Sequence, residues 1–185
     1  MRRSRQVLGQ PLETAEPARI ALCLGCGLLL QGEFNMAEPE LRRALHLYGE
    51  LADQEGQRNS LNVLGTVKAR RGRPVEALEL FSQIRHLSVT LENIEDEANS
   101  LLNIGATYIN MGDHPNALHH LLTLGFSQHH DLPSVERYAL NNLSMSYNGM
   151  GRHQDALEAA LICLNVQVKN EPTQWYAPLK VDEAD

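Results

Sequence analysis

A two-residue pair, a large apolar residue followed by a small one, recurs along this chain at a nearly constant spacing. The first three copies are forty residues apart and the fourth follows after thirty-nine. The four copies are Leu24-Gly25, Leu64-Gly65, Ile104-Gly105 and Leu143-Ser144. A glycine follows each pair after seven residues and an alanine five residues later; these are Gly32, Gly72, Gly112 and Gly151, then Ala37, Ala77, Ala117 and Ala156. A fixed period of this length is typical of stacked supersecondary units that bury their apolar faces against one another.

Each repeat is predicted to hold two helices. Between residues 98 and 111, Leu101, Ile104 and Tyr108 recur at steps of three and four, which is the spacing of an amphipathic helix. Gly112 then predicts the helix end, because glycine adopts the left-handed backbone conformation without steric cost. The second helix is expected to pack through an inner stripe, and small residues at the crossing let two helices approach closely. That stripe is Ala117, Leu121 and Leu124 in the third repeat, and Ala156, Ala160 and Cys163 in the fourth. Pro39 predicts a late start for the second helix of the first repeat.

This pattern resembles the tetratricopeptide repeat over residues 17 to 168: a Leu-Gly pair, an aromatic residue three positions later (Tyr108, Tyr147), a turn glycine, an alanine and a large apolar residue. The resemblance implies an all-α, right-handed α-solenoid of four helix-turn-helix repeats at about 17–56, 57–96, 97–133 and 134–169. Residues 1–16 are expected to form a mobile N-terminal segment, and residues 170–185 a tail or partial cap. The forty-residue period exceeds the usual length of about 34 residues. It is similar to the longer repeats of kinesin light chains, spindle-orientation adaptors and bacterial peptide-sensing regulators. In the first and second repeats, Leu28 and Lys68 stand where the pattern has an aromatic residue.

Composition narrows the class of partner. The net charge of −7 argues against nucleic acid, since phosphate contacts need concentrated lysine and arginine. The apolar stretch from Ile20 to Leu30 is shorter than the roughly 20 residues that cross a bilayer, so no membrane contact is expected. Three cysteines give no disulfide framework, which favours a reducing compartment and a cytoplasmic location.

In tetratricopeptide repeats, which this pattern resembles, the first helix of each repeat lines a concave groove. Counting around each predicted helix at 100° per residue places eight of the thirteen asparagines on the stripe opposite the Leu-Gly pair. Asparagine is a mediocre helix former, so another role is expected there. The predicted peptide-binding residues are Asn59, Asn62, Thr66, Arg70, Asn99, Asn103, Asn110, Tyr138, Asn141, Asn142, Met145 and Asn148.

These residues predict a non-catalytic protein–protein interaction domain that binds a peptide or partner helix in an asparagine-lined groove. A side-chain amide both donates and accepts, so a row of amides suits the backbone of an extended peptide. The related long-repeat adaptors use asparagines in this way, and Asn103 and Asn142 match that position. The alternative is that the asparagines only solvate the face. A second alternative is a sensor or regulatory module of a larger signalling protein that carries a cyclase, kinase or DNA-binding domain.

Charge and the chain end suggest two further properties of the partner. Arg19 and Arg70 lie at predicted groove positions and no acidic residue does, which favours a neutral to acidic ligand segment. An uncapped repeat end can stack on another copy, so a homodimer through the C-terminal end, near Trp175, is also expected.

Neither an enzyme nor a metal or cofactor site is predicted. Cys23-x-x-Cys26 falls in a predicted helix without a second pair for zinc, and cysteine packs as a small apolar residue. His119 and His120 point apart on a helix, while His129-His130 reads as a loop. No phosphate loop, catalytic triad order or zincin motif appears in the sequence.

Overall fold

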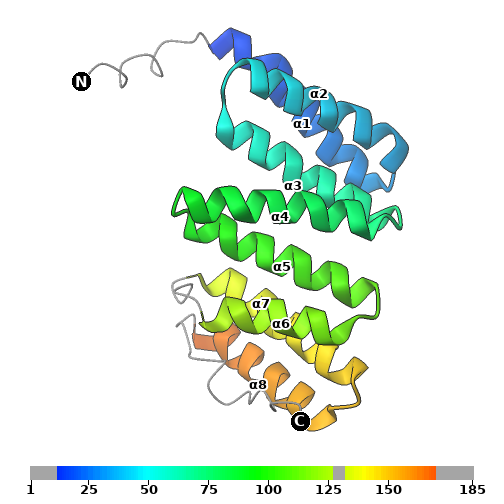
Figure 1. Cartoon of the computed structure of the whole chain (residues 1–185), viewed down its shortest axis with the longest axis vertical. Coiled ribbons are helices and arrows are strands. Elements are labelled where there is room, and N and C mark those ends of the chain that lie inside the picture. Colours follow the sequence, from blue (N-terminus) through cyan, green and yellow to red (C-terminus); the bar gives the residue numbers. More distant parts are fainter. Residues whose placement is uncertain (1–11, 127–131, 170–185) are drawn as a thin grey trace, which may run out of the picture. The chain divides into compact units, whose positions relative to one another are not determined.

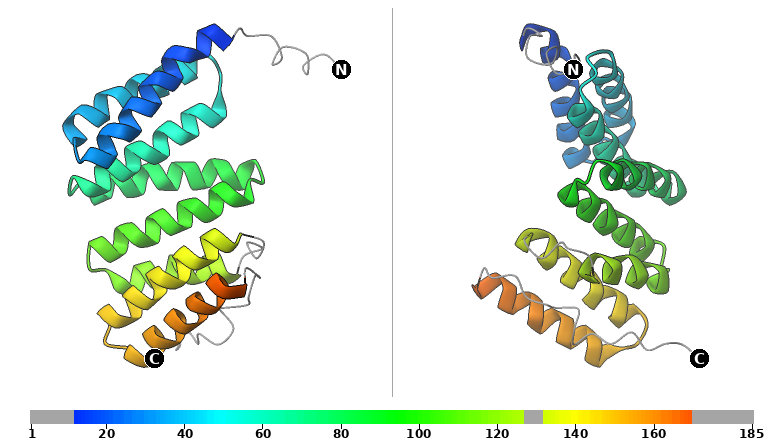
Figure 2. Two further views of the ribbon diagram at one scale, coloured as in Figure 1. Left: turned by 180° about the vertical axis from the view of Figure 1, so that it is seen from behind. Right: turned by 60° about the vertical axis from the view of Figure 1, so that its left-hand side comes forward.

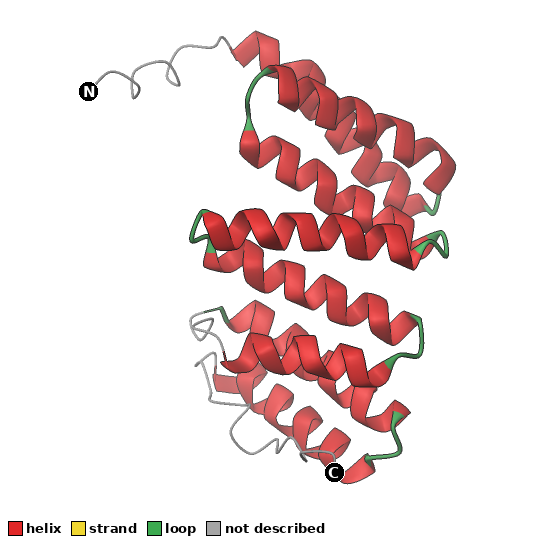
Figure 3. Ribbon diagram, viewed as in Figure 1, coloured by secondary structure: helices red, strands yellow, loops and turns green. Residues whose placement is uncertain are grey.

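The computed structural model describes residues 12–126 and 132–169, and every regular element in these ranges is an α-helix (Figure 1, Figure 3). The chain divides into two compact units, unit 1 over residues Met1–Arg73 and unit 2 over residues Pro74–Asp185. The division falls inside the second predicted repeat, between its two helices.

Unit 1 contains three described helices: α1 (Leu12–Gln31), α2 (Phe34–Glu50) and α3 (Gln54–Arg70). α1 packs along α2, α2 packs along α3, and α1 also touches α3, as the two views of Figure 2 show. Ala18 and Ala21 of α1 meet Ala44 and Tyr48 of α2 in a small buried cluster. Alanines at this contact allow the two helix backbones to lie close together.

Unit 2 contains five described helices: α4 (Pro74–Thr90), α5 (Ile94–Asn110), α6 (His114–Phe126), α7 (Pro133–Gly149) and α8 (His153–Lys169). Each packs against the next, and α5 also packs against α7. Leucines from α5, α6 and α7 form one buried cluster, which includes Leu101, Leu121 and Leu140. The fold class is thus the predicted one: an all-α array of helical repeats of the α-solenoid kind.

The Leu-Gly pairs mark close helix crossings, as predicted. A Cβ built on Gly25 would lie 2.6 Å from the side chain of Leu41, and one on Gly105 would lie 2.8 Å from the side chain of Leu121. Leu41 and Leu121 are fully buried, so neither has room to withdraw. In the fourth repeat, Ser144 replaces the glycine and its hydroxyl donates a hydrogen bond to the Ala156 carbonyl at 2.9 Å.

The turn glycines end the first helices in the predicted way. Gly32, Gly72, Gly112 and Gly151 have φ angles of +80°, +71°, +74° and +76°. At Gly112, the backbone N–H donates to the Ile109 carbonyl and the N–H of Asp113 donates to the Tyr108 carbonyl, both at 2.9 Å. These two bonds make a Schellman turn, which satisfies the last carbonyls of α5.

The first residues of the four helix pairs, and the first residue of α2, differ from the predicted ones. The four helix pairs begin at Leu12, Gln54, Ile94 and Pro133, ahead of the predicted boundaries 17, 57, 97 and 134. Residues 12–16, which were expected to be mobile, therefore belong to α1, while residues 1–11 lie outside the described ranges. The prediction of a late start for α2 is wrong, because α2 begins at Phe34 and contains Pro39. The buried Ala37 and Leu41 on either side stabilise the helix through packing, which outweighs the hydrogen bond that proline cannot make.

Two residues predicted to pack inside are exposed, one near each end of the described chain. Leu24 is 48% exposed, whereas its counterparts Leu64, Ile104 and Leu143 are buried. Ala160, predicted for the inner stripe of the fourth repeat, is also exposed, and Ala159 is buried instead. Within the described residues, no helix precedes α1 and none follows α8, so these faces lack the neighbour that an inner repeat provides.

Candidate functional site

The predicted asparagines of α5 form a narrow strip on its surface. Successive residues of a helix turn by 100°, so Asn99, Asn103 and Asn110 fall within about 40° of one another. Asn110 is exposed, and Asn99 and Asn103 are half-buried, while the opposite side of α5 carries the buried Leu101, Ile104 and Gly105. Core packing therefore fixes which way the three amides point.

α7 carries the matching strip. Tyr138, Asn141, Asn142, Met145 and Asn148 span about 120° of its circumference by the same count, and none of them is buried. Tyr138 and Met145 are 56% and 50% exposed, and the guanidinium of Arg137 lies 5.0 Å from the Tyr138 ring centroid. Because α5 and α7 pack against each other, we treat the two strips together as the asparagine face of unit 2. Its residues are Asn99, Asn103, Asn110, Tyr138, Asn141, Asn142, Met145 and Asn148.

Hydrogen bonds within the protein occupy part of this face. The Oδ1 of Asn148 lies 3.0 Å from Nδ1 of His153, and the Nδ2 of Asn141 lies 3.9 Å from the Met145 sulfur. In the part of the chain that the structure describes, the side-chain amides of Asn99, Asn110 and Asn142 bond no other protein group. These three amides can therefore donate to and accept from a ligand backbone.

Acidic residues border the asparagine face on α5. Glu95 is exposed on the first turn of α5, one helical turn before Asn99, and Asp96 and Glu97 follow it. α5 contains no lysine or arginine. The first turn of α5 therefore places negative charge beside the asparagine face.

The four predicted residues of unit 1 lie together on α3. Asn59, Asn62, Thr66 and Arg70 span about 80° of the helix. Asn59 and Arg70 are exposed, and Asn62 and Thr66 are half-buried. The Thr66 hydroxyl donates to the Asn62 backbone carbonyl at 3.1 Å, a bond within the helix. The structure thus groups the twelve predicted residues as four in unit 1 and eight in unit 2.

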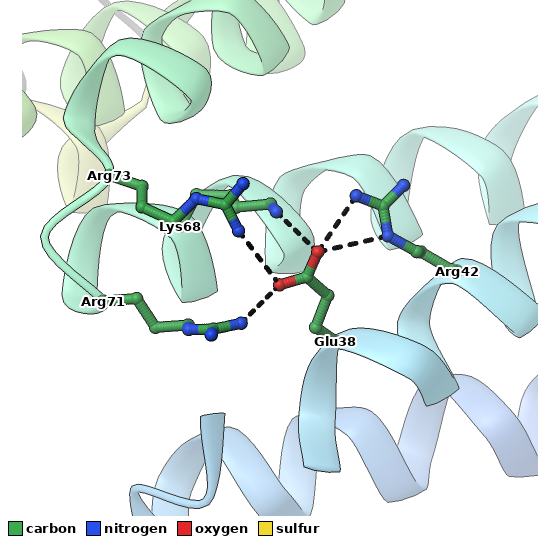
Figure 4. A network of polar contacts seen from close by, with 5 residues as sticks. All are labelled: Glu38, Arg42, Lys68, Arg71 and Arg73. Atoms are coloured by element: carbon green, nitrogen blue, oxygen red, sulfur yellow. Dashed lines mark hydrogen bonds and ion pairs between the residues drawn. The ribbon is translucent and has the colours of Figure 1, made fainter. Parts of the chain in front are cut away.

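A cluster of charged side chains in unit 1 was not predicted. The carboxylate of Glu38 on α2 accepts hydrogen bonds from Lys68 Nζ at 2.5 Å, from Arg42 Nη2 at 2.9 Å and from Arg71 Nη1 at 2.6 Å (Figure 4). Arg73 Nη1 lies 3.6 Å from the same carboxylate. We call Arg42, Lys68, Arg71 and Arg73 the basic cluster.

Burial and charge act in opposite directions on Glu38. Burial alone raises its pKa, but the hydrogen bonds and positive charges of Lys68 and Arg42 lower the pKa to about 2. Glu38 is therefore ionised over the whole physiological range. The sequence did contain a signal for this contact, because Lys68 stands at the position where the third and fourth repeats have tyrosine. Its partner Glu38 stands where the later repeats have Leu78, Leu118 and Leu157.

The cysteines and histidines considered as metal ligands have the following surroundings. Cys23 is exposed and Cys26 is half-buried, so neither thiol is enclosed in the core. Burial, followed by the charge of Cys23, raises the pKa of the Cys26 thiol. The His120 ring stacks on Tyr108 with centroids 5.6 Å apart. His129 and His130 lie outside the described residues. Among the residues the structure does describe, no three His, Cys, Asp or Glu side chains gather as a metal site would require.

Two other predictions concern membrane contact and self-association through the C-terminal end. Over residues 12–126 and 132–169, no helix combines the length and apolar character that crossing a membrane requires. α8 exposes Leu157, Leu161 and Leu164, which are 54%, 54% and 55% exposed. Self-association through the C-terminal end stays a prediction, because Trp175 lies outside the described residues.

No protein-family model matches this sequence, and no curated protein matches it either. What supports the likeness to the tetratricopeptide repeat is therefore the residue pattern together with the packing of neighbouring helices inside each unit.

Proposed function

We propose that this chain is a non-catalytic protein–protein interaction domain of the tetratricopeptide-repeat kind, and that it binds an extended peptide. The observation that carries the proposal is the asparagine face. α5 and α7, which pack together, both turn amide side chains to the surface along matching strips. Such amides are poor for helix stability, so their concentration on one exposed face favours a binding role over a folding role.

The chemistry of the face defines the ligand that would fit. Asparagine amides pair with backbone N–H and C=O groups whatever the side chains of the ligand are. Tyr138 and Met145 add exposed aromatic and thioether surface beside the amides, which suits apolar side chains of a peptide. We therefore expect a mainly neutral peptide in this place, held by its backbone and by one or two apolar anchors.

The three cysteines, all unbridged, fit a reducing compartment such as the cytoplasm.

The test is a peptide selected by the wild-type chain from a displayed random library. We expect Asn103→Ala combined with Asn142→Ala to raise the Kd of that peptide at least tenfold. The thermal midpoint should change little, since neither side chain belongs to the core. Asn165→Ala is the matched control, because Asn165 is an exposed asparagine of α8 away from this face. An unchanged Kd in the double variant, or no peptide selected at all, would refute the proposed function.

A further inference from the structure

One side of α8, the last described helix, is both apolar and exposed. It carries three leucines about one helical turn apart, which we call the α8 strip: Leu157, Leu161 and Leu164. At the same positions of its repeat, α6 has three buried residues, which are Leu118, Leu122 and Gly125. α6 packs against both α5 and α7, whereas no helix follows α8 in the described part of the chain. The α8 strip is therefore a surface that a following helix covers in the preceding repeat.

Ion pairs in the earlier repeats show what this surface contacts. Glu38 of α2 pairs with Lys68 of α3, the next helix along the chain. Arg85 of α4 lies 3.7 Å from Glu97 of α5, measured from Nε to Oε1. By repeat position, Glu38 and Arg85 correspond to the first and last leucines of the α8 strip. These positions of a second helix therefore face the first helix of the following repeat.

α1, the first described helix, exposes the other half of such a contact. On a first helix, the positions of Lys68 and Glu97 face the preceding second helix, and α1 has apolar residues at both. Together with two residues between them they span about 80° of the helix and form what we call the α1 strip: Pro17, Ile20, Leu24 and Leu28. The first three are exposed, whereas α7 buries its residues at the same positions, which are Glu136, Ala139 and Leu143. Glu16 lies outside the strip by the same count, so neither strip contains a charged residue.

The two strips match each other position by position. The contact equivalent to the ion pair of α2 and α3 joins Leu157 of α8 to Leu28 of α1. The contact equivalent to the ion pair of α4 and α5 joins Leu164 to Pro17. Where the inner contacts pair opposite charges, both partners on these two open surfaces are apolar. Bringing the strips together therefore removes apolar surface from water and leaves no charge unpaired.

We infer that this chain associates head to tail, with the α8 strip of one copy seated on the α1 strip of a second copy. Exposed apolar patches mark interaction surfaces, and this contact covers both strips at once. A symmetric dimer that joins α8 to α8 buries the leucines of α8 but leaves Ile20 and Leu24 in water. A contact between two different surfaces leaves one strip open at each end, so it adds further copies and does not stop at a pair.

This inference does not depend on the proposed function, because neither strip shares a residue with the asparagine face. A chain that binds no peptide can still associate, and a chain that stays monomeric can still bind one. The Asn103→Ala and Asn142→Ala variant should therefore associate as the wild type does.

The experiment measures the mean mass of the full chain in solution by light scattering, over a wide range of protein concentration. Two double variants each block one strip with charge. Leu157→Glu with Leu161→Glu blocks the α8 strip, and Ile20→Glu with Leu24→Glu blocks the α1 strip. All four side chains are exposed, so the substitutions leave the core intact.

The matched control is Leu30→Glu with Val75→Glu, which places two charges at exposed apolar residues that belong to neither strip. Circular dichroism checks that each variant is folded, and serine replaces glutamate in any variant that is not. The decisive sample is an equimolar mixture of the two blocked variants. It contains one intact α8 strip and one intact α1 strip, on different copies.

We expect the mean mass of the wild type to rise with concentration above that of one chain. Each blocked variant alone should need at least a tenfold higher concentration to associate, and the control should match the wild type within twofold. The mixture should form a dimer that grows no further, because both of its outer ends are blocked.

Three results would overturn the inference. The wild type stays at the mass of one chain, which a strip covered within its own chain or kept for a different protein produces. The variant with the blocked α1 strip dimerises alone, which a symmetric α8 contact produces. The mixture of the two folded blocked variants stays at the mass of one chain.

Discussion

Lys68 of α3 pairs with Glu38 of α2 across 2.5 Å, and both charged side chains stand where the later repeats carry apolar ones. The third and fourth repeats have Tyr108 and Tyr147 at the lysine position, and leucines at the glutamate position. A charged pair between α2 and α3 thus occupies two repeat positions that hold leucine and tyrosine in the later repeats. Replacing both Glu38 and Lys68 by apolar residues leaves no unpaired charge, whereas replacing only one leaves the other charge without its partner in this pair.

This relationship predicts a strong coupling between the two residues. Glu38→Leu removes the carboxylate beside a lysine that is 1% exposed, and should lower the free energy of unfolding by about 3 kcal/mol. Glu38→Leu combined with Lys68→Met restores an apolar contact and should unfold within about 1 kcal/mol of wild type. Urea unfolding of the wild type, the two single variants and the double variant measures the coupling. Additive losses in the double variant would show that the two residues do not act as a pair.

Glu38 also predicts how stability changes in acid. Its pKa is about 2 in the folded protein and 4.5 for an ordinary glutamate. A depressed pKa contributes stability that is present above the ordinary value and is lost as the pH falls from about 4.5 towards 2. At 1.36 kcal/mol per unit the shift corresponds to about 3 kcal/mol, and the exposure of Arg42 and Arg73 should reduce the measured effect to about 1–2 kcal/mol.

The measurement is the difference in unfolding free energy between wild type and Glu38→Gln at a series of pH values. This difference should be constant above pH 5 or so and should shrink as the pH falls towards 2. Glu79→Gln, at an exposed glutamate of α4, controls for the general loss of stability in acid. A difference that stays constant down to pH 2 would contradict the role assigned to Glu38.

Local backbone and packing rules made much of this fold predictable. The spacing of Leu101, Ile104 and Tyr108 located α5, and Gly112 marked its end, because both depend on residues close in sequence. The asparagines were found on exposed helix surfaces for the same reason, since a helical period assigns each residue to a side.

The basic cluster was not predicted, because the contacts of Glu38 with Lys68 and Arg71 join residues thirty or more positions apart, and only Arg42 is close to Glu38 in sequence. Lys68 departs visibly from the repeat pattern, but its partner depends on how α2 packs against α3. The exposed Leu24 was missed because repeat periodicity assigns every copy the same surroundings. The first copy lacks, within the described residues, the preceding helix that the others have.

The contact between Gly105 and Leu121 predicts opposite effects for two Gly→Ala substitutions. An alanine Cβ at Gly105 would meet the buried Leu121 at 2.8 Å, so Gly105→Ala should destabilise the protein by about 1–3 kcal/mol. Gly27 of α1 has no atom within 4 Å of an added Cβ, so Gly27→Ala should instead stabilise by about 0.5–1 kcal/mol through helix propensity. Thermal and urea unfolding give both values. A stabilising Gly105→Ala would mean that the crossing is looser than the structure shows.

The last prediction concerns Ala52 and Glu92, which follow α2 and α4 with φ angles of +52° and +54°. The two residues are forty positions apart, and each donates its backbone N–H to a carbonyl of the preceding helix, Gly49 and Val89 respectively. The turns therefore have the same form as those at the turn glycines, but with residues that have a Cβ. The left-handed conformation costs such residues about 1–2 kcal/mol, and glycine loses part of this gain through its greater freedom in the unfolded chain. Ala52→Gly and Glu92→Gly should each raise the free energy of unfolding by about 0.5–1 kcal/mol.

The reciprocal substitution Gly112→Ala provides the control, since Gly112 has φ of +74° and no atom within 4 Å of an added Cβ. It should lower the free energy of unfolding by about 1 kcal/mol through backbone strain alone. Urea unfolding of the three single variants measures these changes. Destabilisation by both glycine substitutions, together with a neutral Gly112→Ala, would show that backbone strain does not limit these turns.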